Sequence, residues 1–317
     1  NKSHAIAYAI DSYYAAWLHT HYEKDWLATI LQSENNNPTA LAKAISEIKA
    51  MGYDIATVDV NFSGLEWQWS EERKAFVPPL SSVKGVGKAA MDEIMIKRPY
   101  VDLRDMLYDK DGHWRHSKVN KTCFDALCKI EALGSLKDFE NRTFHNHRQI
   151  HQLIIENYSA LKKNKYGMSM RKALKEGAPE ILDELLPQYA ETHNWGRTER
   201  VSMYFDITAS IRQDLLFPGN ILQKLSSVDV PPVLSFTEPG KNIGWIGVQE
   251  IVFKKTKNNK DFCRIKIYDN ESRTGWLRVW GKPREEIDLF SLWMVEFSYD
   301  KNWGYSSSFY KMKKINV

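Results

Sequence analysis

The hydrophobic period changes along this sequence, and this change limits the fold more than any other feature. From Ile243 onward apolar and polar residues alternate with a period of two, which is typical of half-buried β-strands. Residues 4–31 instead keep apolar side chains at helical spacing, and residues 38–51 read as a helix capped by Asn37 and ended at Gly52. The sequence therefore predicts a multi-domain α+β chain.

The chain divides into four expected segments. Its 317 residues exceed what one hydrophobic core usually serves. Residues 55–77 mix β-branched and aromatic residues with turn signals and predict short extended pieces, and most of residues 80–200 read as helical. The expected boundaries give segments 1–79, 80–140, 141–240 and 241–317.

The last segment predicts a small barrel. Five candidate strands cover residues 244–253, 261–269, 274–281, 292–299 and 307–317, and residues 282–290 are expected to form a short helix. Five strands with a small helix before the fourth are the pattern of a five-stranded OB-fold barrel.

Two neighbouring strands of this barrel carry a pattern suited to single-stranded nucleic acid. Alternation places Cys263, Ile265 and Ile267 of the second strand on one face and leaves the other face polar and aromatic. The third strand repeats this pattern, with Leu277 and Val279 facing the core. Stacking on rings and pairing of cations with phosphates hold single strands without sequence preference. The expected contact residues are Phe262, Arg264, Lys266, Tyr268, Trp276, Arg278 and Trp280.

The charge alternates by block, although the net charge is only +4. Residues 1–79 carry a net −4, residues 80–175 carry +8, residues 176–240 carry −6 and residues 241–317 carry +6. Two basic blocks indicate two surfaces for a polyanion, because Lys and Arg that neutralise phosphates dominate nucleic-acid affinity.

The first basic block contains a Gly-x-Gly turn that opens a helix. Glycines there let backbone N–H groups approach a phosphate, and the helix start adds its positive end. This is the logic of a helix-hairpin-helix element on duplex DNA, although a tight connection between two helices uses glycines too. Its expected contact residues are Lys84, Gly85, Val86, Gly87 and Lys88.

Several segments together resemble the family C DNA polymerases, the bacterial replicative DNA polymerase III α subunits. They are NKSHAIAYAIDSYYAAWLHTHY at residues 1–22, VDVNFS, LSSVKGVGKAAMDEI and VNKTCFDALCKIEALGSL. They stand in the order of that family's C-terminal part: the end of the fingers, a tandem helix-hairpin-helix region and an OB domain. The second hairpin departs from the pattern, since Glu131 stands where a glycine is expected.

The resemblance implies further roles. Asn1, Lys2, Ser3 and His4 would face the incoming nucleotide, and Gln213, Leu216 and Phe217 resemble the peptide that holds a sliding clamp. The catalytic carboxylates and their Mg²⁺ would lie in a palm outside this chain, so we assign no catalytic residue or metal ligand here. The expected partners are primer-template DNA, single-stranded template, the incoming dNTP, the palm-bearing segment or chain, and a clamp.

Other interpretations stay open. A noncatalytic DNA-binding or processivity module would share the hairpin and the barrel, and a scaffold could use the barrel to bind protein. Zinc sites built from His113, His116, Cys123 and Cys128, or from His145, His147 and His151, lack finger spacing and are disfavoured. The three cysteines and the lack of a long apolar run favour a cytoplasmic location, in a bacterium or for a virus in a bacterial host.

Overall fold

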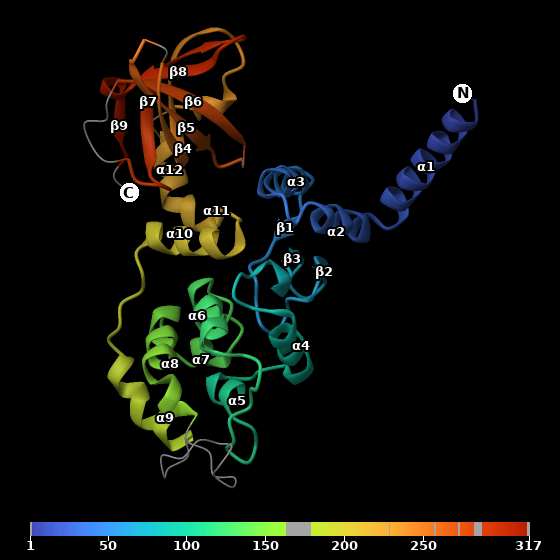
Figure 1. The fold of residues 1–317 in the computed structure, drawn as a ribbon, viewed down its shortest axis with the longest axis vertical. Coiled ribbons are helices and arrows are strands. Elements are labelled where there is room, and N and C mark those ends of the chain that lie inside the picture. The colour runs from blue at the N-terminus through green and yellow to red at the C-terminus, as the bar shows by residue number, and fades with distance from the viewer. Residues whose placement is uncertain are drawn as a thin grey trace. The chain divides into compact units, whose positions relative to one another are not determined.

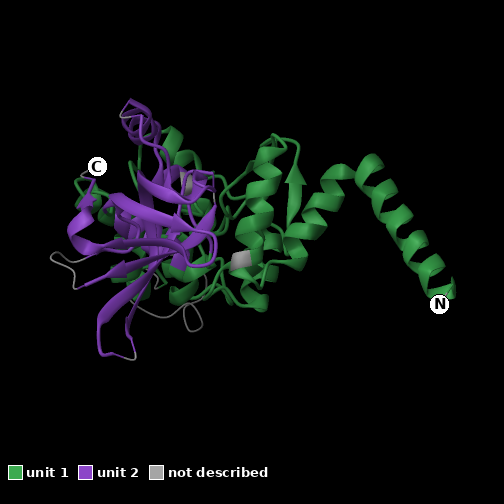
Figure 2. Ribbon diagram, turned by 90° about the horizontal axis from the view of Figure 1, so that it is seen from above, with its two compact units in different colours: residues 1–195, 206–209 green, residues 196–205, 210–317 purple. Residues whose placement is uncertain are grey.

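The computed structural model describes residues 2–162, 179–227, 229–256, 258–271, 273–281 and 287–315. The chain forms two compact units (Figure 2). Unit 1 comprises residues 1–195 and 206–209, and unit 2 comprises residues 196–205 and 210–317. Unit 1 is mainly helical and unit 2 contains a large sheet, which confirms the predicted multi-domain α+β class (Figure 1). The finer division into four segments stays a prediction.

Unit 1 begins with three helices, α1 (Lys2–His21), α2 (Glu23–Ser33) and α3 (Pro38–Ala50). The Asn37 side chain accepts a hydrogen bond from the backbone N–H of Ala40 at 3.3 Å and caps α3 as predicted. Gly52 follows α3 with a φ of +92°, a left-handed value that glycine adopts without strain.

A small sheet packs against α2 and α3. Its strands β1 (Asp54–Ile55), β2 (Gln68–Ser70) and β3 (Ala75–Val77) lie in the order β1-β3-β2, within the region predicted to be extended. Leu31 of α2, Ile48 of α3 and Phe76 of β3 share one buried cluster. The sheet therefore holds the N-terminal helices α2 and α3 to the unit.

The remainder of unit 1 consists of short helices. They are η1 (Leu80–Ser82), α4 (Lys88–Lys97), α5 (Leu103–Leu107), α6 (Lys121–Lys129), α7 (Lys137–Glu140), α8 (His147–Leu161), α9 (Pro179–Leu185) and η2 (Leu186–Tyr189). The Asn120 side chain caps α6, and Asn146 with Gln149 forms a capping box at α8. The turns that join η1 to α4 and α6 to α7 are the two hairpins.

Helix α10 (Arg197–Thr208) contributes residues to both units. Unit 2 continues with α11 (Gln213–Leu216), α12 (Gly219–Ser227) and η3 (Val233–Ser235). Its sheet contains β4 (Gly240–Lys255), β5 (Asp261–Tyr268), β6 (Thr274–Trp280), β7 (Leu292–Asp300), β8 (Gly304–Ser308) and β9 (Met312–Lys314), with η4 (Phe309–Lys311) between the last two.

Five of these strands form a closed ring of pairings, β4-β5-β6-β8-β7. Strand β4 closes the ring because residues 240–247 pair with β7 and residues 247–255 pair with β5. The β6–β8 pairing is parallel and the other pairings of the ring are antiparallel. This ring agrees with the five-stranded barrel expected from the sequence.

Two expected elements differ from the structure. The predicted fifth strand, 307–317, is wrong in its bounds: β8 ends at Ser308 and η4 interrupts the chain. Strand β9 then resumes pairing along the same edge of β7 as β8, while β4 pairs with the other edge. The helix expected over residues 282–290 falls partly on residues 282–286, which lie outside the described residues, and residues 287–290 are not helical.

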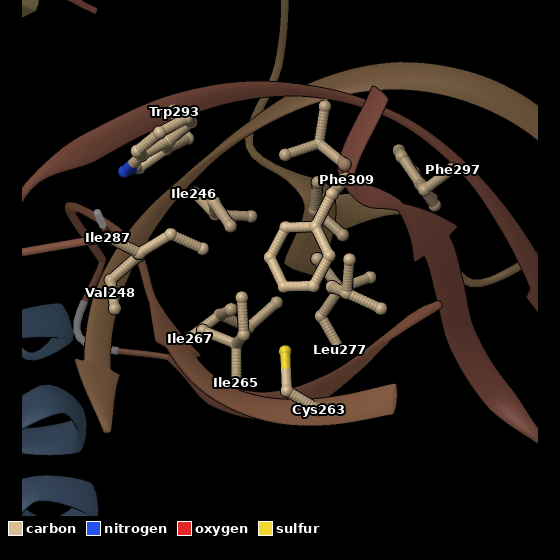
Figure 3. Packing of buried hydrophobic residues seen from close by; sticks show 13 residues of the cluster. Ile246, Val248, Cys263, Ile265, Ile267, Leu277, Ile287, Trp293, Phe297 and Phe309 are labelled. Carbon is tan, nitrogen blue, oxygen red and sulfur yellow. The ribbon is translucent and has the colours of Figure 1, made fainter. Parts of the chain in front are cut away.

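The ring encloses an apolar core (Figure 3). Cys263, Ile265 and Ile267 of β5 are fully buried there, as alternation predicted, together with Leu277 and Val279 of β6. Phe309 of η4 points into the same interior, which explains why a short helical turn interrupts the chain between β8 and β9. None of the helices in the described part of the chain has the length and apolar character needed to cross a membrane.

Candidate nucleic-acid interface

The first hairpin places an uncapped helix start at the surface. Gly87 is the N-cap of α4 and has no side chain to accept from the first N–H groups, and both Gly87 and Lys88 are exposed. A Cβ on Gly87 would meet no atom within 4 Å, and its φ of −75° suits any residue. The fold therefore does not require glycine at this position, whereas close approach of a ligand would.

The other glycine of this turn has a structural role. Gly85 adopts a φ of +98°, and its carbonyl oxygen accepts a hydrogen bond from the Cys123 Sγ at 3.1 Å. A Cβ there would lie 3.5 Å from atoms of Thr122 and Ala126 on α6. Gly85 thus shapes the turn against α6.

The expected contact residues of this hairpin separate into buried and exposed members. The Val86 side chain is 5% exposed and anchors the turn in the interior. The Lys84 Nζ donates to the carbonyl oxygen of Asp206 at 2.9 Å, and the Lys84 N–H donates to that of Ile207 at 3.0 Å. Of the two lysines, Lys88 is the one whose ammonium group has no partner among the described residues.

The second hairpin follows α6. Glu131 adopts a φ of +61°, so the position where the sequence led us to expect glycine has the backbone conformation that glycine favours. The carbonyl oxygen of Ala132 accepts a hydrogen bond from the Val60 N–H at 2.9 Å. The hairpin conformation is retained with a non-glycine residue, at a typical strain of about 1–2 kcal/mol.

Asp59 connects the second hairpin to the small sheet. Its carboxylate accepts hydrogen bonds from the Ser135 hydroxyl at 2.7 Å and the Ser135 N–H at 3.1 Å, and forms an ion pair with Arg73 at 3.1 Å. Sequence reasoning noted VDVNFS but gave Asp59 no role. The sequence signal that could have found it is an aspartate between two valines, Val58 and Val60. Both valines are buried in the structure.

Glu93 of α4 performs a similar task beside the first hairpin. Its carboxylate accepts from the backbone N–H groups of Ser117, Lys118 and Val119 at 2.7–3.0 Å and pairs with Lys97 at 2.7 Å. Burial opposes ionisation, but these donors hold the pKa of Glu93 well below its usual range. Glu93 thereby fixes the segment that leads into α6.

The outer face of β5 and β6 presents rings and cations side by side. Phe262 pairs with Trp280, Arg264 with Arg278, and Lys266 with Trp276 across the two strands. The Arg264 guanidinium lies 4.5 Å from the Trp276 ring centroid, and the Phe262 and Trp280 centroids are 5.3 Å apart. We call these six residues the β5–β6 platform.

The platform carries three cations and no carboxylate of its own, while Glu250 of β4 stands opposite Lys266. Arg264 and Arg278 stand directly opposite each other, an arrangement that is unfavourable without an anion. Among the residues that the structure describes, Arg264, Lys266 and Arg278 form no ion pair with a carboxylate. Trp276 and Trp280 remain 37% and 38% exposed, so their rings are accessible for stacking.

Trp303 extends the platform, and sequence reasoning missed it. It lies in the turn between β7 and β8 with 71% of its surface exposed, and the Arg278 guanidinium is 5.9 Å from its ring centroid. The Asp300 side chain accepts a hydrogen bond from the Trp303 N–H at 3.0 Å and orders the turn. A single large ring in the polar stretch DKNWG was the signal that could have found it.

Tyr268 is a correction to the predicted face. It is 1% exposed and packs with Phe217, Trp245 and Leu292 in a second cluster of unit 2. Alternation placed it correctly on the outer side of β5, but residues of α11 and α12 cover that end of the strand. Burial raises the pKa of its hydroxyl, which has no hydrogen-bond partner among the described residues. Tyr268 therefore belongs to the core.

Comparisons with known proteins agree with this geometry. The family described as "Helix-hairpin-helix motif" matches residues 52–143. DNA polymerase III subunit alpha of Pseudomonas fluorescens is 30% identical over 161 residues, 51% of this chain and 13% of that protein. The same subunit from Thermus aquaticus is 33% identical over 142 residues, 44% of this chain and 11% of that protein.

A longer match comes from Campylobacter jejuni. Its DNA polymerase III subunit alpha is 25% identical over 288 residues, which cover 85% of this chain and 22% of that protein. The chain is thus similar in sequence to a part of DNA polymerase III subunit alpha. It spans about a tenth to a fifth of the length of these relatives.

The residues that the polymerase resemblance assigned to nucleotide contact lie at the start of α1. Asn1 lies outside the described residues, and Lys2, Ser3 and His4 are exposed. The His4 ring contacts Tyr8, with centroids 4.5 Å apart. Nothing in the structure assigns these residues a ligand, so their role stays a prediction.

The segment that resembles a polymerase clamp peptide forms a short helix. Residues Gln213–Leu216 form α11, and Leu216 and Phe217 are 1% and 5% exposed in the cluster with Trp245 and Tyr268. The burial favours a core role for Leu216 and Phe217. Clamp binding by Gln213, Leu216 and Phe217 stays a prediction that would need the Leu and Phe side chains to leave the core.

The zinc alternatives gain no support within the described residues. His116 is buried and its Nε2 bonds the Met106 carbonyl oxygen at 2.8 Å, and Cys123 and Cys128 are buried free thiols. In the described ranges, Asp109, Asp111 and His113 are the one group whose ligand atoms converge. There the Asp109 Oδ1 already accepts from the N–H groups of Asp111 and His113, which is a turn geometry.

Proposed function

We propose that the chain is the DNA-handling part of a family C replicative DNA polymerase and acts in DNA synthesis only with a palm. One observation carries this proposal: this chain, which is similar to DNA polymerase III subunit alpha, combines a helix-hairpin-helix region with a platform of aromatic rings and cations. The first suits duplex backbone and the second suits unpaired strand.

The hairpin Lys84, Gly85, Val86, Gly87 and Lys88 holds duplex DNA in this proposal. The backbone at Gly87 and the start of α4 receive a phosphate, and Lys88 adds a cation. Val86 supports the turn from the interior, and the exposed Lys84 supports it through its hydrogen bond to the Asp206 carbonyl oxygen. Such contacts position the duplex without reading its sequence.

The β5–β6 platform and Trp303 guide the unpaired template strand. Trp276, Trp280 and Trp303 offer three ring surfaces, and each lies near an arginine that can meet a phosphate. The OB-fold assignment supports this role, because such folds bind oligonucleotides on the face of their second and third strands, which correspond to β5 and β6.

The remaining assignments concern the assembled polymerase. Lys2 and His4, with Asn1 and Ser3, contact the triphosphate of the incoming dNTP. The palm, on another segment or chain, supplies the carboxylates that hold Mg²⁺, which activates the primer 3′ oxygen. The cluster of Asp109, Asp111 and His113 does not fit the role of holding Mg²⁺. One carboxylate oxygen of Asp109 already accepts hydrogen bonds from the N–H groups of Asp111 and His113. Clamp attachment through residues 213–217 requires Leu216 and Phe217 to leave the core.

One experiment separates the proposal from its alternatives. Fluorescence anisotropy would measure binding of the chain to a primer-template duplex and to a single-stranded oligonucleotide, with and without Lys88→Glu and Trp276→Ala. We expect Lys88→Glu to weaken duplex binding and Trp276→Ala to weaken single-strand binding. A chain that binds neither DNA would contradict the proposal and favour a protein-binding scaffold. Primer extension with the palm-bearing segment, with and without this chain, distinguishes a polymerase part from a noncatalytic module.

A further inference from the structure

We propose that α1 is a docking helix whose apolar stripe packs against the remaining polypeptide of the polymerase. The stripe consists of Ile6, Ile10, Tyr13 and Trp17. The stripe packs against an apolar surface of the remaining polymerase, meaning the part of the related subunits that this chain does not match. This inference rests on the proposed function and adds a surface that holds the assembly together.

Helix α1 is long and contributes no buried side chain to a hydrophobic core. It has twenty residues, and not one of them is buried. A helix of this length is about 30 Å long and is only marginally stable in water when it stands alone. Most helices gain their stability from packing an apolar face, and α1 buries no such face against the part of the chain that the structure describes.

The second observation is the placement of its large side chains. Positions 6, 10, 13 and 17 follow the i, i+4, i+7, i+11 spacing that lines one face of a helix. Their exposed fractions are 60% for Ile6, 49% for Ile10, 65% for Tyr13 and 41% for Trp17. The opposite face carries the polar residues His4, Asp11, Ser12 and His19, with Tyr8 as one exposed ring among them. Contiguous exposed apolar surface of this kind marks an interaction site.

The charge of the helix identifies the class of partner. From Ser3 to Tyr22, Asp11 is the single Asp, Glu, Lys or Arg residue. A phosphate backbone would be met by Lys and Arg, which the stripe lacks. Aromatic residues without charge are enriched instead in the centre of protein–protein interfaces.

The length of the relatives identifies which protein fits. The chain corresponds to 11–22% of three polymerase subunits, so most of such a polymerase lies outside this chain. Residues at the start of α1 are the ones proposed to contact the dNTP, which requires the palm to lie nearby. A surface of that remaining polypeptide would both cover the apolar stripe and bring the palm close to the start of α1.

The test uses a matched pair of variants on the two faces of α1. Ile10→Glu with Tyr13→Glu places two carboxylates on the stripe, and Ser12→Glu with Ala15→Glu places two at the same spacing on the opposite side. Binding of each full-length chain to the separately expressed palm-bearing polypeptide from the same source is measured by analytical ultracentrifugation. Circular dichroism checks helix content, and anisotropy checks duplex DNA binding.

We expect the stripe variant to bind the palm-bearing polypeptide at least about 30-fold more weakly than wild type, as for loss of an interface hot spot. The control should stay within about threefold, and all three chains should bind duplex DNA equally. The inference would be overturned if both variants bound the palm-bearing polypeptide equally well. It would also be overturned if this chain formed dimers through the stripe and did not bind the palm-bearing polypeptide. Failure of the wild-type chain to bind DNA would instead count against the proposed function.

Discussion

The hydroxyl of Ser135 donates a 2.7 Å hydrogen bond to the carboxylate of Asp59, although 76 residues separate them in the sequence. The same carboxylate pairs with Arg73, so one buried acid joins the second hairpin to the β2–β3 turn. Because Asp59 is almost fully buried, its charge is stabilised by these donors and by little water. The geometry of the hairpin region depends on this junction.

Loss of the Asp59 junction should destabilise unit 1. We expect Asp59→Asn to lower the free energy of unfolding by about 3 kcal/mol, because the ion pair and the charge-assisted hydrogen bonds are lost together. Ser135→Ala removes one hydroxyl and should cost about 1 kcal/mol. Urea denaturation of the single and double variants gives the coupling energy. Strictly additive effects would show that the two side chains do not act together.

Acid should destabilise unit 1 through His116. Burial is the main cause that lowers the pKa of His116 to about 4, while nearby Glu93 opposes it and Lys97 and Arg115 reinforce it. Between about pH 6.5 and 4 the unfolded chain binds a proton that the folded chain does not, so stability falls as the pH falls. The loss should approach about 3 kcal/mol.

Denaturation at pH 7.0 and pH 4.5 measures this dependence, with His116→Gln as the variant that no longer titrates. The slope in this window should flatten in the variant. The depressed pKa of Glu93 adds a separate loss that begins only below about pH 4.5. Unchanged wild-type stability between the two pH values would contradict the assignment to His116.

The two glycines of the first hairpin should respond differently to alanine. Gly87→Ala should leave stability within about 0.5 kcal/mol, because its φ is ordinary and its Cβ would meet open space. It should nevertheless weaken duplex binding several-fold by keeping a phosphate away from α4. Gly85→Ala should cost about 1–2 kcal/mol through its positive φ.

Gly52→Ala is the control for backbone strain, since Gly52 also has a positive φ but follows α3. It should lower stability as Gly85→Ala does and leave duplex affinity unchanged. Anisotropy titrations of all three variants at one salt concentration test this. Full duplex affinity in Gly87→Ala would remove the hairpin from the proposed interface.

The platform tryptophans should each contribute to single-strand binding. Trp276→Ala, Trp280→Ala and Trp303→Ala should each weaken binding of a single-stranded oligonucleotide by about tenfold or more, because base stacking contributes about 1–3 kcal/mol per ring. Tyr268→Phe is the control, since it removes only a buried hydroxyl without a partner in the described residues. Its affinity should match wild type. A similar loss in Tyr268→Phe would show that the assay reports folding rather than contact.

The residues of the clamp-like peptide should act mainly in the core. Leu216→Ala should lower the free energy of unfolding by about 2–5 kcal/mol, because the side chain is buried with Phe217 and Trp245. Asp214→Ala is the control on the same short helix; it removes an exposed carboxylate and its ion pair with Arg212 and should cost about 1 kcal/mol or less. Pull-down with a sliding clamp then tests the alternative: loss of clamp binding in a Leu216→Ala chain of unchanged stability would favour an anchor role.

Local chemistry in the sequence determined much of this protein. Asn37 and Gly52 mark the ends of α3 because a cap and a left-handed residue act within one helical turn. Alternation along β5 and β6 correctly placed Cys263, Ile265 and Leu277 in the barrel core, since successive side chains of a strand point to opposite faces.

The tertiary structure decided what covers each face. Alternation placed Tyr268 on the outside of its strand, but α11 and α12 return over that end and bury it. Trp303 joins the platform only because β8 pairs with both β6 and β7, and Asp59 meets Ser135 only when the small sheet packs beside the second hairpin. These contacts join residues that are far apart in the chain. A local sequence pattern predicts which face of a strand a side chain lies on, but it does not predict which distant residue will pack against that face.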